Sequence, residues 1–281
     1  MLTAGKLLRL AFDHLGQTTY STITSATASS IVDSAQVEAF ADDIWIAGGI
    51  FIVKVAADAA PLNQFSRISA YAGDTGTFTL QDALTADPPD GSEYAWASSL
   101  YPVQSMFRLI TPALRMIGPV PIDVDLTLVD DQVEYSLPAA YKQLTPIAVW
   151  GQLGETTWND EVTPALIHDY HVRRTTPGAA GGLVIPGGLG SGVAKVSYVA
   201  AHPEINAYSD YISEYIDERL AMLALVVTML EWQIGRTQGA EDYVKEEHNK
   251  ATSQFNEALV LHAPDLPLST PQLFITGGSG S

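Results

Sequence analysis

An abrupt change of hydrophobic period at Gly118-Pro119 places a helix and a strand next to each other in the chain. Before it, apolar residues recur at helical spacing up to Ile117, whereas apolar and polar residues alternate at 124–129. A Gly-Pro step ends a helix, because proline lacks the amide hydrogen that another turn needs. We expect the alternating segment to be a strand that turns at Asp130-Asp131 and returns through 133–137 as a hairpin. The chain therefore passes directly from a helix into an antiparallel β lobe.

The same two periods divide the rest of the chain into helical and β-rich segments. Helical spacing of apolar residues predicts helices at 3–15, 102–117, 209–234 and 240–261. Ser, Thr and β-branched residues, interrupted by Gly and Pro, predict β structure at 17–98 and 119–202. In the second β segment the candidate strands are 144–152, 165–173, 183–185 and 193–199. Pro112 should kink or split its helix, and Tyr243 and Phe255 are expected to face inward from theirs.

This order of segments predicts an α+β fold in which two antiparallel β lobes are inserted into a helical bundle. The bundle would gather the N-terminal helix, the middle helix and the two long C-terminal helices. The predicted domains are the helical bundle (1–16 plus 99–118 plus 203–262), an inserted β unit (17–98), a β-sandwich-like lobe (119–202) and an extended C-terminal arm (263–281). Three prolines between residues 264 and 271 argue against helix in the arm.

The charge balance restricts the partners. The chain has 32 acidic and 14 basic residues, a formal net charge of −18. Gripping DNA requires clustered Lys and Arg, so the sequence argues against specific nucleic-acid binding, although an acidic surface suits DNA that must pass without sticking. The chain has no cysteine, which excludes disulfides, thiolate nucleophiles and Cys-based zinc sites. We expect no signal peptide and no membrane span, because the longest apolar run, 220–230, is shorter than the ~20 residues needed.

Several patterns could carry chemistry, but each has a structural alternative. His168 and His171 could form a metal pair, but residues three apart on a strand point to opposite faces. Adjacent carboxylates could form acid/base pairs or cation sites, but neighbouring side chains diverge and no calcium-loop pattern surrounds them. These pairs are Asp42-Asp43, Asp130-Asp131 and Glu246-Glu247. Turns and solvated faces explain all of them.

Two further patterns suggest ligands. The glycines of 187–192 resemble a phosphate loop, but they lack the Lys-Ser/Thr pair and precede an expected strand. Trp150 and Trp158 could form an exposed platform for a sugar, or anchor the strands and the turn between them. We therefore expect no cofactor, no metal site and no catalysis.

Two apolar segments point to binding partners. The run 220–230 is apolar on most faces of its helix, so it lies either at the centre of a bundle or against another subunit. The residues predicted to pack between subunits are Leu220, Leu223, Val227 and Leu230. The arm has apolar residues with no domain left to pack into, so it is either a disordered tail or docks on a neighbour as an added strand. Its predicted partner-binding residues are Leu266, Leu268, Leu273, Phe274 and Ile275.

The order of these segments also carries a resemblance. A first helix "GKLLRLAFDHLG" precedes "TSATASSIVDS", and a β unit follows with "DDIWIAGGIFIV", "RISAYAGDTGTFTL" and "DGSEYAWA". A helix ending "PALRMIG", the segment "DLTLVDDQVEYSLPAAY" and a C-terminal helix pair complete the chain. Over nearly its whole length the chain resembles the head-to-tail connector (adaptor) proteins of tailed bacteriophages.

The resemblance implies a structural virion protein at the head–tail junction, assembled in the host cytoplasm. Members of the family form a ring, usually dodecameric, beneath the portal, with the bundle packed around a DNA channel. The implied partners are the portal protein, a tail or stopper protein, other copies of the chain, and double-stranded DNA that passes without specific binding. The portal contact would be the arm at 264–276.

Two other readings of the sequence remain. A virion fibre or receptor-binding β-protein would use the lobe at 119–202 to recognise host glycan and would form trimers. An enzyme such as a glycan hydrolase would need two carboxylates facing each other across a cleft. No segment of the sequence indicates such a pair.

Overall fold

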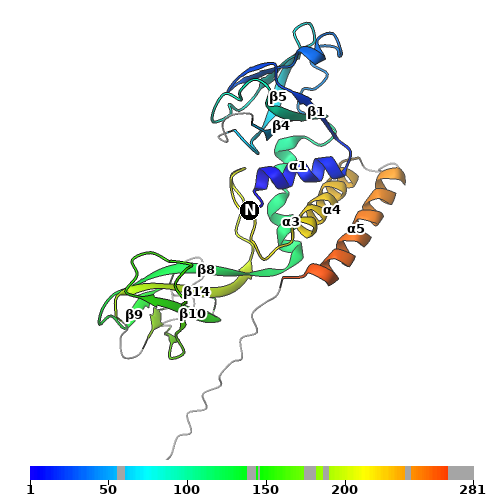
Figure 1. The fold of residues 1–281 in the computed structure, drawn as a ribbon. Helices are drawn as coiled ribbons and strands as arrows, with labels where there is room; N and C mark the ends of the chain where they lie inside the picture. Colours follow the sequence, from blue (N-terminus) through cyan, green and yellow to red (C-terminus); the bar gives the residue numbers. More distant parts are fainter. Residues whose placement is uncertain are drawn as a thin grey trace, which may run out of the picture. The chain divides into compact units, whose positions relative to one another are not determined.

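The computed structural model describes residues 1–55, 61–137, 144, 146–173, 182–185, 190–237 and 242–264. These residues form two compact units (Figure 1). The first unit joins Met1–Gly118 to His202–Pro264, and the second comprises Pro119–Ala201.

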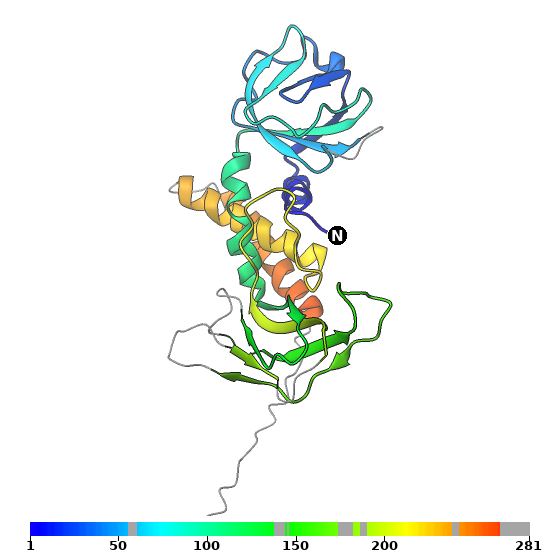
Figure 2. The same cartoon turned by 90° about the vertical axis from the view of Figure 1, so that its left-hand side faces the viewer.

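The first unit contains a seven-stranded antiparallel sheet in the order β1-β7-β4-β5-β6-β3-β2. Its strands are β1 (Thr18–Thr22), β2 (Ser25–Thr27), β3 (Ser30–Val32), β4 (Gly49–Lys54), β5 (Phe65–Ala72), β6 (Thr77–Leu80) and β7 (Glu93–Ala97). Between β1 and β2, Ile23 N–H donates to Ser92 O (2.8 Å), beside β7, and Thr24 N–H donates to Val32 O (2.8 Å) in β3. The continuous segment from β1 to β2 therefore bonds to the β7 side of the sheet at one end and to β3 at the other. The sheet thus closes on itself as a small barrel (Figure 2).

The core of the barrel is mainly apolar and includes a hydrogen-bonded tyrosine–aspartate pair. Its largest side chains include Ile31, Ile50, Ile52, Ile68, Tyr71, Phe78, Tyr94 and Trp96. The Tyr94 hydroxyl donates to Asp33 Oδ2 (2.8 Å), and Asp33 Oδ1 accepts from Ala35 N–H (2.9 Å) at the start of the 3-10 turn η1 (Ser34–Gln36). Burial and the Asp33 carboxylate raise the pKa of the Tyr94 phenol. The phenol thus stays a donor, and the pair ties β7 to η1.

The helix predicted at 3–15 is confirmed as α1 (Ala4–His14). The Thr3 side chain accepts from Lys6 N–H (3.3 Å) as the N-cap, and Gly16 follows the helix with a positive φ of 64°.

The helix predicted at 102–117 is split in two, as Pro112 led us to expect. The pieces are α2 (Val103–Phe107) and α3 (Ile110–Ile117), and the backbone between them stays in the right-handed helical region. The break falls at Arg108-Leu109, ahead of the proline. Pro112 thus lies in the first turn of α3, where its missing amide hydrogen has no intrahelical partner to lose.

The helix predicted at 209–234 begins later than expected, as α4 (Glu218–Thr237). The Asp217 carboxylate determines this start, because it accepts from the backbone N–H groups of Arg219 (2.9 Å) and Leu220 (3.1 Å). The last helix is α5 (Asp242–His262). In this helix group α4 is central and contacts α1, α3 and α5.

The predicted fold class is wrong. In the described residues the structure is mostly antiparallel β, with fourteen strands in three sheets, and is no helical bundle carrying inserted lobes. The short helices α1 and α2 pack their apolar faces onto the barrel instead of only onto other helices. The Phe12 ring of α1 lies 5.3 Å from that of Phe51 in β4, and the Phe107 ring of α2 lies 5.2 Å from that of Phe65 in β5. An aromatic interface therefore joins the helices to the outside of the barrel, next to the barrel's own core.

The second unit has two antiparallel sheets around a single core. The four-stranded sheet has the order β11-β10-β14-β8, and the three-stranded sheet has the order β12-β13-β9. The strands are β8 (Pro119–Leu128), β9 (Glu134–Ser136), β10 (Ala148–Leu153), β11 (Ala165–Leu166), β12 (His171–Arg173), β13 (Gly182–Val184) and β14 (Gly192–Ala201). The core includes Tyr135, Val149, Leu183, Val196 and Tyr198.

The hairpin predicted at 124–137 is wrong in its pairing, although its turn is correct. Asp131 has a positive φ of 59°, and the chain reverses there. However, β8 pairs along its whole length with β14, whereas β9 pairs with β13 in the other sheet. The strand predicted at 165–173 is also wrong, because it divides into β11 and β12, which lie in different sheets. The turn sends the chain from one sheet to the other.

His202, where the chain re-enters the first unit, should make that unit sensitive to acid. The imidazole is 2 % exposed, its Nδ1 lies 2.8 Å from Pro203 O, and its Nε2 accepts from Ser213 N–H (3.0 Å). Burial, assisted by the nearby Arg115 charge, lowers the pKa of His202. As the pH falls below ~6.5, His202 becomes protonated in the unfolded chain before it does so in the folded chain. The free energy of unfolding therefore has its full value above that pH and declines below it, by up to ~1.4 kcal/mol per pH unit.

Urea unfolding between pH 7.5 and 5 measures this effect. We expect His202→Gln to flatten the pH dependence relative to wild type. An identical slope for wild type and His202→Gln would contradict the assignment.

Candidate functional site

The apolar run predicted to pack between subunits lies at the centre of the helix group. Leu220, Leu223, Val227 and Leu230 are all buried within a single chain. Because α1, α3 and α5 surround α4, the chain itself already accounts for this burial. Their role in subunit packing stays a prediction, and the surfaces open to a partner belong to the outer helices.

The predicted partner-binding residues of the arm lie outside the described residues. These are Leu266, Leu268, Leu273, Phe274 and Ile275. Their binding to a portal or to a neighbouring subunit therefore stays a prediction.

The outward face of α5 exposes large apolar side chains. The helix packs through Ala251, Phe255 and Ala258, which are its buried residues. Tyr243, Val260 and Leu261 are 67 %, 85 % and 69 % exposed. The expectation that Tyr243 faces inward is wrong, because at ~100° per residue it lies about a quarter of a turn from the centre of the buried stripe. An exposed apolar face on a long helix is a candidate interaction surface.

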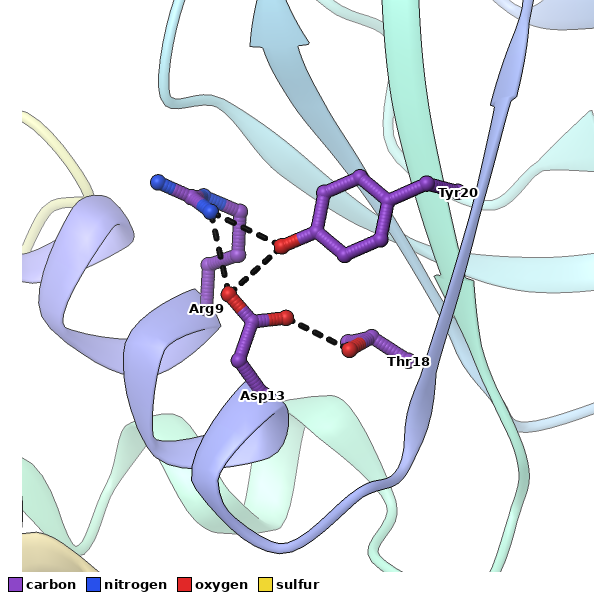
Figure 3. Close-up of polar contacts among 4 residues, drawn as sticks. All are labelled: Arg9, Asp13, Thr18 and Tyr20. Carbon is purple, nitrogen blue, oxygen red and sulfur yellow. Dashed lines mark hydrogen bonds and ion pairs between the residues drawn. The ribbon is translucent and has the colours of Figure 1, made fainter.

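A polar cluster fixes α1 against the barrel (Figure 3). Asp13 Oδ2 accepts from Arg9 Nη1 (3.0 Å) and from the Tyr20 hydroxyl (2.5 Å), while Oδ1 accepts from Thr18 Oγ1 (2.5 Å). Arg9 Nη1 also donates to the Tyr20 oxygen (3.0 Å). Partial burial and the bond to Asp13 raise the pKa of Tyr20. Both Asp13 oxygens are engaged, so the cluster positions α1 on β1 and leaves no free acid or base.

The candidate metal and acid/base residues have structural roles or solvent exposure. His171 belongs to β12 and His168 lies before it, exposed and on no strand. Asp42 Oδ1 accepts from Gly73 N–H (2.7 Å) and Asp43 Oδ1 from Tyr71 N–H (3.1 Å), which anchors a loop to β5. Among the described residues, no group of three or more His, Cys, Asp or Glu could hold a metal ion.

The other two carboxylate pairs and the glycine run also have structural explanations. Asp130 and Asp131 form the exposed turn after β8. Glu246 is exposed on α5, and Glu247 lies 3.9 Å from Lys250 Nζ. Of the glycine run, 187–189 lie outside the described residues; a strand follows the run, as expected, although β14 already begins at Gly192.

The two tryptophans lie near one lysine on the outer face of the four-stranded sheet. Trp150 pairs with Lys195, which pairs in turn with Asp125. Lys195 Nζ lies 4.5 Å from the centre of the Trp158 ring. The buried Gln152 amide positions the Trp158 loop by donating to the carbonyl oxygens of Asn159 (2.7 Å) and Val162 (2.6 Å). Trp150 remains 37 % exposed, so an indole and two charges are accessible together.

The second unit also has a hollow of about 300 Å³. It is lined by Gly151, Leu153, Ala165, Leu166, Ile167, His168, Asp169 and Ile185. Asp169 is the single carboxylate among these residues, whereas glycoside hydrolysis needs two that face each other. The hollow is an apolar depression beside one histidine and one acid.

Comparison of the chain with protein-family models and with curated proteins found no match. No helix in the described ranges is both long and apolar enough to cross a membrane.

Proposed function

We propose that the chain is a structural virion protein of a tailed bacteriophage, forming a ring below the portal that joins capsid to tail. The ring would be dodecameric and lie at the head–tail junction, with the portal on one side and a tail or stopper protein on the other. Double-stranded DNA would pass through it during packaging and ejection. The proposal starts from the sequence resemblance and takes its support from the surfaces of the helix group.

The outward face of α5 is the observation that carries the proposal. Tyr243, Val260 and Leu261 are each more than 60 % exposed in the single chain. Leaving such side chains in water costs free energy that burial would recover, at about 25 cal/mol for each Å² of apolar surface. In a ring, a neighbouring copy would cover this face of α5 in every subunit.

The charge of the chain supports passage of DNA. With a net charge of −18, its average surface repels phosphate. In the part of the chain that the structure describes, six basic residues are already within 4.0 Å of a carboxylate: Lys6, Arg9, Lys54, Arg173, Lys245 and Lys250. A channel built from such a surface would let DNA slide.

The alternative function, a fibre or receptor-binding protein for host glycan, is favoured by one arrangement. Trp150 offers a ring for stacking a sugar, and Lys195 and Asp125 beside it offer a donor and an acceptor for hydroxyl groups. Such a protein would be trimeric and bind sugar through the second unit.

Electron microscopy of the full chain mixed with portal rings of the same phage tests the proposal. We expect the protein to cap the portal as a ring, and a copy lacking 265–281 to lose the capping, because the predicted arm contact is removed. A matched control lacks 277–281, "GGSGS", and keeps the apolar arm residues; it should cap normally. A trimer without portal affinity that binds on a glycan array would overturn the connector proposal in favour of the alternative.

A further inference from the structure

The helix group has two open faces on opposite sides of α4. Helix α3 packs on one side of α4 and α5 on the other (Figure 1). One side of α3 and one side of α5 are therefore turned away from the group, in opposite directions. A single copy cannot bring these two faces together.

The α3 side presents two arginines without an ion-pair partner in the described residues. Arg108 and Arg115 are both exposed, and no carboxylate of the described chain forms an ion pair with either. They are seven residues apart on a backbone that stays helical across the break, so they lie on one side, about 10 Å apart. Pro112 and Met116 are exposed beside them. In a chain with more than twice as many acidic as basic residues, two unpaired arginines on one face are available to an anionic partner.

The α5 face carries the matching charge. Glu246 and Glu257 are exposed, and neither carboxylate forms an ion pair within the described residues. They are eleven residues apart, which at 3.6 residues per turn places them on the same side, about 16 Å apart. This side is opposite the buried stripe, and Tyr243, Val260 and Leu261 flank the two carboxylates. Lys250 lies on the same side between them but is paired with Glu247 (3.9 Å), so the face keeps two unpaired carboxylates with apolar residues at its ends.

We propose that these faces bind each other between copies: the Glu246 and Glu257 side of α5 in one copy docks on the side of α2 and α3 that carries Arg108 and Arg115 in the next. The inference rests on the proposed ring and names the contact that would close it. When two different faces meet head to tail, the pair of copies still has one free arginine face and one free α5 face, to which further copies can bind. Such a head-to-tail contact is the geometry that generates a ring. The apolar residues of both faces become covered at the same contact.

A second copy fits the arginines better than DNA does. DNA binding needs several clustered cations, and two arginines on a chain of net charge −18 would work against long-range repulsion by phosphate. The α5 face instead offers carboxylates on a preformed helix, and Arg pairs with carboxylates with high geometric specificity.

Charge exchange between the faces tests the contact. One full-length variant carries Arg108→Glu and Arg115→Glu, and a second carries Glu246→Arg and Glu257→Arg. We expect each alone to associate at least ~100-fold more weakly than wild type, because every contact then sets like charges against each other. A mixture of the two should recover association, since each contact again joins opposite charges, and so should one chain carrying all four changes. Sedimentation and electron microscopy, free and on portal rings, measure the outcome.

A charge-matched control separates this contact from a general charge effect. Lys54→Glu with Arg219→Glu makes the first unit more negative by as much as the arginine variant does but lies outside both faces, and it should form rings as wild type does. Rings formed by the two face variants alone, loss of rings in the control, or no recovery in the mixture would overturn the contact while leaving the ring itself in place. DNA retention that disappears with the arginines would assign them to DNA instead. A wild-type chain that stays monomeric both free and on portals would remove the ring and the contact together.

Discussion

Phe12→Ala is expected to lower the free energy of unfolding of the first unit by about 3–5 kcal/mol, the usual cost of removing a buried phenylalanine ring. The Phe12 side chain is 0 % exposed. Its ring centre lies 5.3 Å from that of Phe51 in the barrel and 6.3 Å from that of Tyr101, ahead of α2. The ring therefore fills the space where helix and sheet meet, and the cavity left by alanine would weaken both layers.

Amide hydrogen exchange read separately in β4 and α4 tests whether the two layers are coupled. We expect Phe12→Ala to reduce protection in both by a similar amount, because the Phe12–Phe51 contact joins barrel and helices within one compact unit. Phe40→Ala is the matched control: this ring is 36 % exposed and packs on Trp45 alone among the ring contacts found in the described residues. It should cost about 1 kcal/mol or less. Loss of protection in α1 and α4 without loss in β4 would mean that the helices fold independently of the barrel.

The sequence predicts most elements of this fold but not their partners. Thr3 and Gly16 mark the ends of α1, and alternating residues locate β8 and β14, because caps and periodicity are local properties. Pairing is not local. The alternation at 124–129 suits any antiparallel neighbour, and the nearest candidate along the chain was 133–137. The structure instead pairs β8 with β14, whose ten residues match β8 in length, far along the sequence.

The difference between local patterns and non-local partners also explains why the predicted fold class was wrong. An amphipathic pattern indicates that one side of a helix is buried without identifying what covers it. In α1 the apolar stripe of Leu7, Leu8 and Phe12 suits a helical neighbour and a sheet equally well, and the structure provides both. Helices separated by a β segment therefore suggested a bundle, whereas α1 packs on that β segment as well as on α4.

The candidate surfaces could be predicted only in part. The apolar run of α4 indicates a helix covered on several sides, and the structure shows that its own chain provides the cover. The open face of α5 was not predicted, because Tyr243 lies close enough to helical spacing to be assigned to the inner stripe. Arg108 and Arg115 were missed because their significance depends on the absence of a nearby carboxylate in the described fold, which no local pattern reveals.

Gly5→Ala is expected to lower the free energy of unfolding of the first unit by about 3 kcal/mol, through overpacking at the start of α1. A Cβ atom at Gly5 would lie 2.0 Å from the carbonyl oxygen of Asn63, far inside contact distance. Neither side can move away freely. Gly5 N–H donates to Tyr208 O (2.9 Å), and Asn63 N–H donates to Ile52 O (3.0 Å) in β4. Relief of the clash must break one of these bonds.

Calorimetry of the full chain would register this as a fall of about 6–12 °C in the Tm of the first unit, at the 2–4 °C per kcal/mol typical of its size. Gly235→Ala is the matched control, because this glycine lies inside α4 with no atom within 4 Å of an added Cβ. There alanine should raise stability by about 0.5–1 kcal/mol, since it favours helix over glycine. Glycine-to-alanine substitution is thus expected to change the free energy of unfolding with opposite signs at these two helical positions. Equal Tm values for Gly5→Ala and wild type would show that α1 does not approach the backbone of Asn63 so closely.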